Sequence, residues 1–486
     1  MNFIQKINKN NIFIFLLITY SILFLFNNYD SLGFFADDGT TLYYLFKSQS
    51  FKEVLNHSIS FDAARDLHLI WQYLFIKISG ENIIENLHFY QIVFYLINSY
   101  LLCVILKKLK FNNIIITLIW TIAIFFPAYS EVVFWIHAFT MVLISTFFFL
   151  LFIIVQLSLI KSQIAIKFFF KNLISIFLLL LSLFTYEQNI FVSLGIVFLV
   201  NYICFKNNFI SKKSGITNLI IYFLIITFFI LYKLNEAGFF NPNITKYQTG
   251  SDIIFTLQIF KNFILGFVLN IIELKNINII FSFKILLFNF LLLFTIYPIF
   301  FKPNKDIVFF NKDFLIRIFL CIILFILSLI PLYFHYISDR HLYLPSFFMF
   351  IGMAYLLDFF SKLKKKNNYA KFFVFIFIFI YTNTFINNFD NKKKIIIENF
   401  KMKKFFYNSL TKHNKIDISK DKIYLVGFPD LHNGEVFFAH EPEVNFKLID
   451  QNDELPFILK TKNTKKAHNT IFFKNIKNKK LVYEVN

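Results

Sequence analysis

Apolar runs long enough to cross a lipid bilayer recur along most of this chain. Runs of about 17–25 apolar residues match the helix length that spans the hydrocarbon core. Composition points the same way, since 57% of the 486 residues are hydrophobic and 16% are charged, whereas soluble domains carry about a quarter charged residues. The sequence therefore predicts an all-α polytopic membrane protein.

Basic residues are grouped in short blocks between the apolar runs. The net charge of +20 would suggest nucleic-acid binding in a soluble chain. Short Lys/Arg blocks beside apolar runs instead mark cytoplasmic loops, so nucleic acid is not an expected partner. The three cysteines lie inside apolar runs and indicate neither a disulfide framework nor a metal site. The basic blocks fall at Lys107–Lys110, Lys161–Lys171, Lys206–Lys213 and Lys362–Lys371.

Span lengths and charge blocks together predict about eleven transmembrane helices. The first run is expected to be retained, because Asn27–Asp30 does not resemble a signal-peptide cleavage site. Lys261–Leu274 is expected to lie along the outer interface, since a crossing there would put the next basic loop outside. The predicted spans are Asn11–Phe26, Leu87–Leu106, Ile114–Tyr129, Phe139–Ile160, Asn172–Thr185, Ile190–Phe205, Ile216–Tyr232, Ile279–Phe301, Phe314–Tyr336, Tyr343–Phe360 and Phe372–Phe389.

The polar tail differs from the rest of the chain. Ile423–Pro429 is predicted to be a strand that ends in a turn, and Asn433-Gly434 is a tight-turn dipeptide ahead of a second short strand at Val436–Phe438. We therefore expect a membrane domain over residues 1–389 and a small extracytoplasmic α+β or β-rich domain over residues 390–486.

Several polar residues are not explained by the predicted membrane topology, and they lie on its predicted outer side. Ionisable groups at a membrane boundary are expensive and often functional. A carboxylate can take the proton from an attacking hydroxyl, and an arginine can bind a phosphate through two parallel hydrogen bonds. Such a set suits sugar transfer from a phosphate-linked donor. The candidates are Asp37 and Asp38 as catalytic residues and Arg65, Glu131, His137, Glu187, Gln188, Arg340, His341 and Tyr343 as substrate-binding residues.

Each candidate also has a structural interpretation. Asp37-Asp38 suits a helix N-cap, Arg340 suits a snorkelling anchor, and Tyr343 suits the interfacial aromatic belt. Glu131 and Glu187 are equally compatible with solvated loop acids. No ligand spacing indicates a metal site; a divalent cation is left open, and no cofactor is assigned.

The order of these segments resembles the GT-C superfamily of integral membrane glycosyltransferases. The most similar pattern is that of the O-mannosyltransferases with tetratricopeptide repeats and their bacterial relatives. The resemblance spans residues 34–352 and rests on Asp37-Asp38, Arg65-Asp66-Leu67, Phe126-Pro127-Ala128-Tyr129-Ser130-Glu131-Val132-Val133-Phe134-Trp135-Ile136, Tyr186-Glu187-Gln188 and Arg340-His341-Leu342-Tyr343-Leu344-Pro345-Ser346.

The resemblance implies a polyprenyl- or dolichyl-phosphate sugar donor and a reaction on the non-cytoplasmic face. It implies a catalytic role for Asp37 or Asp38, places Glu131 and Glu187 in the site, and puts Arg340 against the donor phosphate. Phe126 stands where the family has His, Asp66 stands where Pro is usual, and the repeat domain is absent. The sugar and the acceptor therefore stay open.

We therefore expect an integral membrane glycosyltransferase in the cytoplasmic membrane, with its site facing outside. Its expected partners are a lipid-linked sugar donor, membrane lipid, and a cell-surface glycan, lipid or protein acceptor. A transporter or lipid-carrier flippase is an alternative; it should show polar residues at mid-membrane and matching halves, and the sequence has few intramembrane charges and no such halves. A non-catalytic membrane assembly protein is a further alternative.

Overall fold

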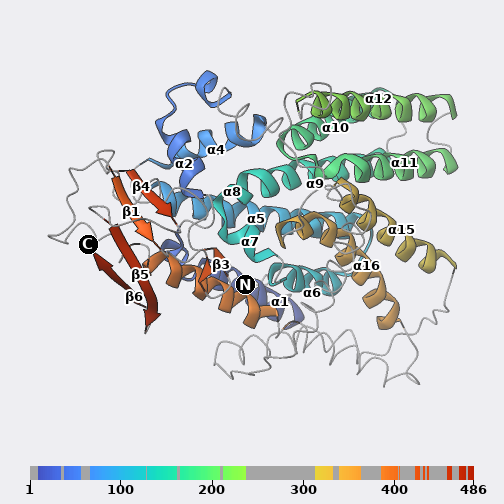
Figure 1. Ribbon diagram of the computed structural model, residues 1–486. Helices are drawn as coiled ribbons and strands as arrows, with labels where there is room; N and C mark the ends of the chain where they lie inside the picture. The colour runs from blue at the N-terminus through green and yellow to red at the C-terminus, as the bar shows by residue number, and fades with distance from the viewer. Residues whose placement is uncertain are drawn as a thin grey trace, which may run out of the picture.

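Helices make up most of the described chain, which Figure 1 shows as a bundle of long helices with a small sheet. The computed structural model describes residues 9–33, 38–55, 66–80, 82–126, 129–160, 165–207, 212–236, 312–331, 339–362, 382, 385–402, 404, 422–426, 431–432, 435–436, 457–461, 470–477 and 480–485. The longer helices are α1 (Lys9–Phe26), α5 (Ile83–Lys108), α6 (Asn113–Ile124), α9 (Ile144–Leu159), α10 (Ala165–Thr185), α11 (Ile190–Lys206), α12 (Lys212–Glu236), α15 (Lys312–Leu329) and α16 (Tyr343–Ser361).

Seven helical stretches within the described residues are long and apolar enough to cross a membrane. The predicted helical membrane architecture is confirmed in this coarse form. The predicted spans Ile279–Phe301 and Phe372–Phe389 and the interfacial segment Lys261–Leu274 lie wholly or largely outside the described residues, so the total of eleven stays a prediction. The seven stretches are Ile14–Ser31, Ile83–Lys108, Ile136–Leu159, Phe168–Thr185, Glu187–Lys206, Ser214–Lys233 and Tyr343–Ser361.

The surface of the bundle also fits a lipid environment. Phe169 and Phe177 of α10 and Phe223 and Phe228 of α12 are each about 60% exposed or more. Soluble proteins rarely expose contiguous apolar surface on this scale. In a bilayer these rings contact acyl chains, so the outward faces of α10 and α12 are lipid-facing.

The third predicted span is shorter than expected. The sequence predicts a span over Ile114–Tyr129, whereas α6 ends at Ile124 after 12 residues. Proline disfavours helical geometry in the residue before it, and Pro127 follows Phe126. The next long helical stretch begins at Ile136 rather than at the predicted Phe139.

Neutral polar side chains link the helices inside the bundle. Nε2 of Gln156 donates to Oγ of Ser175 (2.7 Å) and to the hydroxyl of Tyr222 (2.8 Å), which joins α9, α10 and α12. Asn172 of α10 donates to Oδ1 of Asn218 of α12 at 2.5 Å. Such hydrogen bonds between helices fix their register where lipid provides no hydrophobic driving force.

The basic ends of several helices lie together. Phe111 follows the lysines that end α5, and its ring centroid lies 4.7 Å from that of Tyr355 in α16. Phe314, in the first turn of α15, stacks on Phe359 near the end of α16 at 4.8 Å. Lys107–Lys110, Lys312 and Lys362 therefore mark the same end of the bundle.

Cysteine labelling should place this basic end in the cytoplasm. In a variant without the native cysteines, single cysteines at Lys108 and Lys362 should react with an impermeant reagent only after permeabilisation, because basic loops stay inside. A cysteine at Lys394, whose side chain is 64% exposed, should react in intact cells. A residue-394 cysteine that needs permeabilisation would contradict the topology and the outward-facing site.

The described strands form a four-stranded sheet in the order β4-β1-β5-β6. β1 (Lys422–Val426) runs parallel to both β4 (Phe457–Thr461) and β5 (Thr470–Lys477), and β6 (Lys480–Val485) runs antiparallel to β5. β2 (Leu431–His432) pairs with β3 (Glu435–Val436). β1 overlaps the strand expected at Ile423–Pro429, while the class of the whole domain and its side of the membrane stay predictions.

Candidate functional site

The segment between α6 and α9 is broken into short pieces. It contains α7 (Ser130–Phe134), α8 (Ile136–Ala138) and a π-helical stretch, η4 (Phe139–Leu143). Trp135, between α7 and α8, has extended backbone angles (φ −101°, ψ 111°). The helical hydrogen-bond ladder is interrupted there, so nearby carbonyls need other partners.

Side chains of α5 supply those partners. Nε2 of Gln91 donates to the carbonyls of Val132 (2.7 Å) and Trp135 (2.9 Å). The Tyr95 hydroxyl donates to the carbonyl of Ile124 (2.7 Å), at the end of α6. Irregular backbone is tolerated at membrane depth only where other parts of the protein form hydrogen bonds with its free carbonyl and amide groups. The bonds from α5 therefore stabilise the interrupted backbone between α6 and α9.

Asn98 and His88 extend the same row of polar side chains on α5. Nδ2 of Asn98 donates to the carbonyl of Leu143 (2.9 Å), where α9 begins. The ring of His88 contacts the carbonyl of Gly33 (3.1 Å) and Oε1 of Gln91 (2.9 Å). The residues of this row are spaced three and four positions apart, so they lie on one face of α5. They are His88, Gln91, Tyr95 and Asn98.

Glu131 and His137 are carried by this anchored segment. Glu131 belongs to α7, and the placement of its side chain lies outside the description. His137, in α8, is buried beside His68 of α4 (Asp66–Ser79), with perpendicular rings and centroids 4.4 Å apart. The hydroxyl of Thr140 lies within hydrogen-bond distance of both Nδ1 of His68 (3.0 Å) and the carbonyl of His137 (3.3 Å), so it links the two histidines.

The second acid of the pair begins a short helix. Asp38 is the first residue of α2 (Asp38–Lys47), which contacts both α4 and α8. Asp37, Arg65 and the side chain of Asp38 lie outside the described residues. Both the catalytic and the helix-cap interpretations therefore stay predictions.

The chain just before the acidic pair is tightly enclosed. A Cβ at Gly33 would lie 1.9 Å from the ring of Phe400, so a larger residue would force that ring to move. Lys393, about two turns before Phe400 on the same face of the 385–402 helix, is buried and donates to the carbonyls of Leu25 (3.0 Å) and Asn27. The 385–402 helix thus caps α1 and holds the start of the loop that leads to Asp37.

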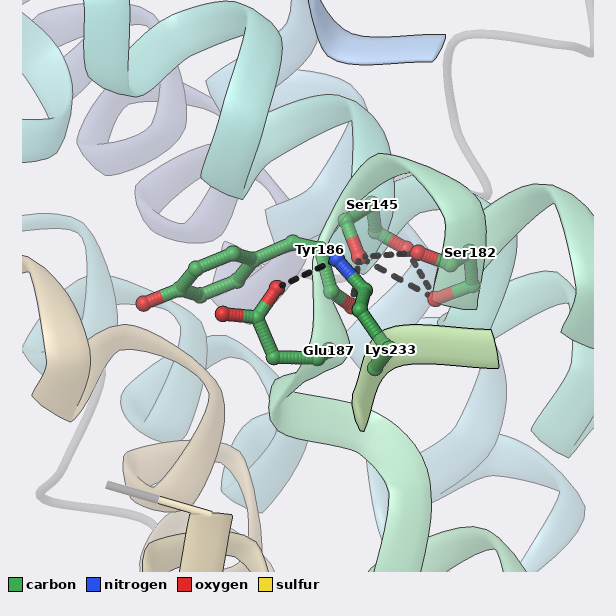
Figure 2. A network of polar contacts seen from close by, with 5 residues as sticks. All are labelled: Ser145, Ser182, Tyr186, Glu187 and Lys233. Atoms are coloured by element: carbon green, nitrogen blue, oxygen red, sulfur yellow. Dashed lines mark hydrogen bonds and ion pairs between the residues drawn. The ribbon is translucent and has the colours of Figure 1, made fainter. Parts of the chain in front are cut away.

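Paired serines fix the turn that carries Glu187, as Figure 2 shows. Oγ of Ser145 donates to the carbonyl of Ser182 (3.0 Å), and Oγ of Ser182 donates to the carbonyl of Ser145 (2.9 Å). Nδ2 of Asn189 donates to Oγ of Ser145 (3.0 Å). These bonds join α9 to α10 and hold η5 (Glu187–Asn189) against them.

Glu187 and Gln188 make different contacts from the same turn. Glu187 forms an ion pair with Lys233 of α12, with 3.5 Å between Oε2 and Nζ. Gln188 is buried, and its Nε2 donates to the carbonyl of His341 (2.6 Å). Gln188 therefore ties η5 to η8 (Asp339–Leu342), the turn that carries Arg340.

The residues of the last motif are mostly enclosed. The Arg340 side chain lies outside the description, while its turn, η8, contacts α7. His341 is 5% exposed, and its ring is stacked on the ring of Tyr186, with 6.3 Å between the centroids. Tyr343 is fully buried, and its ring centroid lies 4.5 Å from that of Tyr129. Tyr343 thus fills an aromatic core, while its predicted role in substrate binding stays untested.

The structure brings most of the predicted segments to one end of the bundle. α2 contacts α8, α7 contacts η8, and Gln188 joins η8 to η5. Sequence reasoning assigned no role to Gln91, His68 or Lys233. The inward position of Lys233 could have been predicted from the sequence, because Lys233 continues the helical spacing of Tyr222, Ile226 and Phe229 along α12.

Comparison with known protein families, with curated proteins and with solved structures found no match for this chain. Within the described residues, no group of three or more His, Cys, Asp or Glu side chains could hold a metal ion. The described part of the candidate site contains acidic and basic residues, two neighbouring histidines and buried amides beside a lipid-facing surface.

Proposed function

We propose that this protein is a GT-C-type membrane glycosyltransferase. It transfers a sugar from a polyprenyl-phosphate-linked donor to a cell-surface glycan, lipid or protein acceptor on the non-cytoplasmic face. The meeting of α2, α7, α8, η5 and η8 at one end of the bundle carries the proposal. These elements hold Asp38, Glu131, His137, Glu187 and Arg340.

The proposed reaction needs one base and one cation. The carboxylate of Asp37 or Asp38 takes the proton of the acceptor hydroxyl while its oxygen attacks the anomeric carbon. The bond between that carbon and the phosphate oxygen breaks, and polyprenyl phosphate leaves with the electron pair. Arg340 stabilises the charge that develops on the phosphate. The donor's apolar tail remains in the lipid that surrounds the bundle.

Membranes that contain the protein should form a glycosidic bond when polyprenyl-phosphate sugar is supplied without any nucleotide sugar. A lipid-linked donor already carries the activated sugar, so no soluble donor is needed. Transfer of a radiolabelled sugar to an acceptor fraction measures this, with membranes lacking the protein as the control. Strict dependence on a nucleotide sugar would refute the proposal. Movement of labelled lipid across the bilayer without a new bond would instead indicate a flippase.

A further inference from the structure

Lys233 lies on the buried face of α12. Tyr222, Ile226 and Phe229 are each at most 2% exposed, and Lys233 follows at the same helical spacing. Its Nζ lies 5.6 Å from the centroid of the Phe229 ring. A lysine near the end of a span usually extends toward water along the outside of the helix. Lys233 instead turns toward the bundle interior.

Lys233 forms an ion pair with a carboxylate. Its ammonium lies 3.5 Å from Oε2 of Glu187, and both side chains are 18% exposed; Figure 2 shows the pair beside the serine network. Both residues lie at the end of a candidate span, and ionisable side chains of spans that face the bundle interior often mark binding sites and transfer paths.

The two members of the pair are held differently. Glu187 lies on η5, which Ser145, Ser182 and Asn189 fix to α9 and α10. Lys233 lies in the last turn of α12, a helix whose opposite face is exposed to lipid. Glu187 is therefore held in place by two helices, whereas Lys233 belongs to a helix with one face in contact with lipid.

We propose that Lys233 binds the phosphate of the lipid-linked donor and that Glu187 is the counter-ion that orients its ammonium. This inference rests on the proposed glycosyl transfer and adds a phosphate ligand to it. The turn that holds Glu187 is bonded through Gln188 to η8, the turn of Arg340. Two cations from neighbouring elements suit a phosphate whose negative charge increases as the sugar leaves.

Binding of a fluorescent polyprenyl phosphate to the full-length protein in zwitterionic nanodiscs tests the proposal without requiring transfer. Lys233→Gln should weaken binding about tenfold to hundredfold, the range of one charge-assisted hydrogen bond. Lys233→Arg should restore it, and Glu187→Gln should tighten it because the competing carboxylate is gone. The matched control is Lys362→Gln, which breaks the 2.6 Å pair with Asp358 at the basic end and should leave binding unchanged.

Two further probes identify the source of the phosphate. Polyprenol, which lacks the phosphate, should bind weakly and equally to the parent and to Lys233→Gln. Inorganic phosphate should compete poorly; competition at the same concentration as polyprenyl phosphate would overturn the assignment to a lipid.

Failure of this inference differs from failure of the proposed function. If sugar transfer proceeds but Lys233→Gln changes neither polyprenyl phosphate binding nor the donor KM, the pair is a structural tether and the inference is wrong. If Lys233-dependent binding is found without any transfer, the phosphate site stands and the glycosyltransferase proposal fails. Equal loss of thermal stability in Lys233→Gln and Glu187→Gln, with unchanged binding, would also overturn the inference.

Discussion

Asp→Asn substitution at one of the two positions, Asp37 or Asp38, should abolish sugar transfer while the protein stays inserted and folded. Asparagine keeps the shape of the side chain and can still cap a helix, but it cannot accept the proton of the acceptor hydroxyl. Loss of a general base lowers the rate by about 10²–10⁴-fold. Initial rates with polyprenyl-phosphate sugar, normalised to protein in the membrane, measure the effect.

Controls separate a base from a helix cap. Asp30→Asn changes an acid in the preceding 3-10 turn, η2 (Tyr29–Ser31), and should leave the rate unchanged. Arg340→Lys should lower the rate as well, because lysine keeps the charge but loses the planar fork that binds phosphate. Parent-like rates for both Asn variants and for Arg340→Lys would show that the catalytic site has been placed wrongly, even with the fold intact.

Gln91→Met should destabilise the interrupted backbone between α7 and α8 and sharply lower the rate of sugar transfer. Methionine has a similar length, but it leaves the carbonyl of Val132 without a donor and removes one of the two donors to the carbonyl of Trp135, which keeps its bond from the amide of Phe139. A buried group left unsatisfied costs about 1–3 kcal/mol, and misplacement of a catalytic segment by about 1 Å can cost 10²-fold in rate. Faster hydrogen exchange of amides in residues 129–138, together with a lower kcat, is the expected result.

Gln156→Met is the matched control for that variant. Gln156 is equally buried, and its Nε2 also donates two hydrogen bonds, but to Ser175 and Tyr222 rather than to the broken segment. It should lower the melting temperature without faster exchange in residues 129–138 and without a fall in kcat at temperatures where both variants are folded. Equal exchange and equal kcat in the two variants would contradict a specific role for Gln91.

The positions of most long apolar helices follow from the sequence alone. Bilayer thickness sets a local requirement, so an apolar run reports a span without knowledge of its neighbours. The predicted Ile190–Phe205 and Tyr343–Phe360 accordingly lie within one residue of α11 (Ile190–Lys206) and α16 (Tyr343–Ser361). The motifs also named in advance the turns that carry Glu187 and Arg340, because unexplained polar residues stand out between apolar runs.

The way in which those segments are held together depends on contacts between residues that are distant in the sequence. The break at Trp135 is stabilised by Gln91, which lies 44 positions away, and local sequence does not specify such a partner. The inward position of Lys233 depends on which face of α12 meets the turn of Glu187, and that is settled by helix–helix contacts. Span positions follow from interactions of each segment with lipid, whereas the site depends on hydrogen bonds and ion pairs between distant segments.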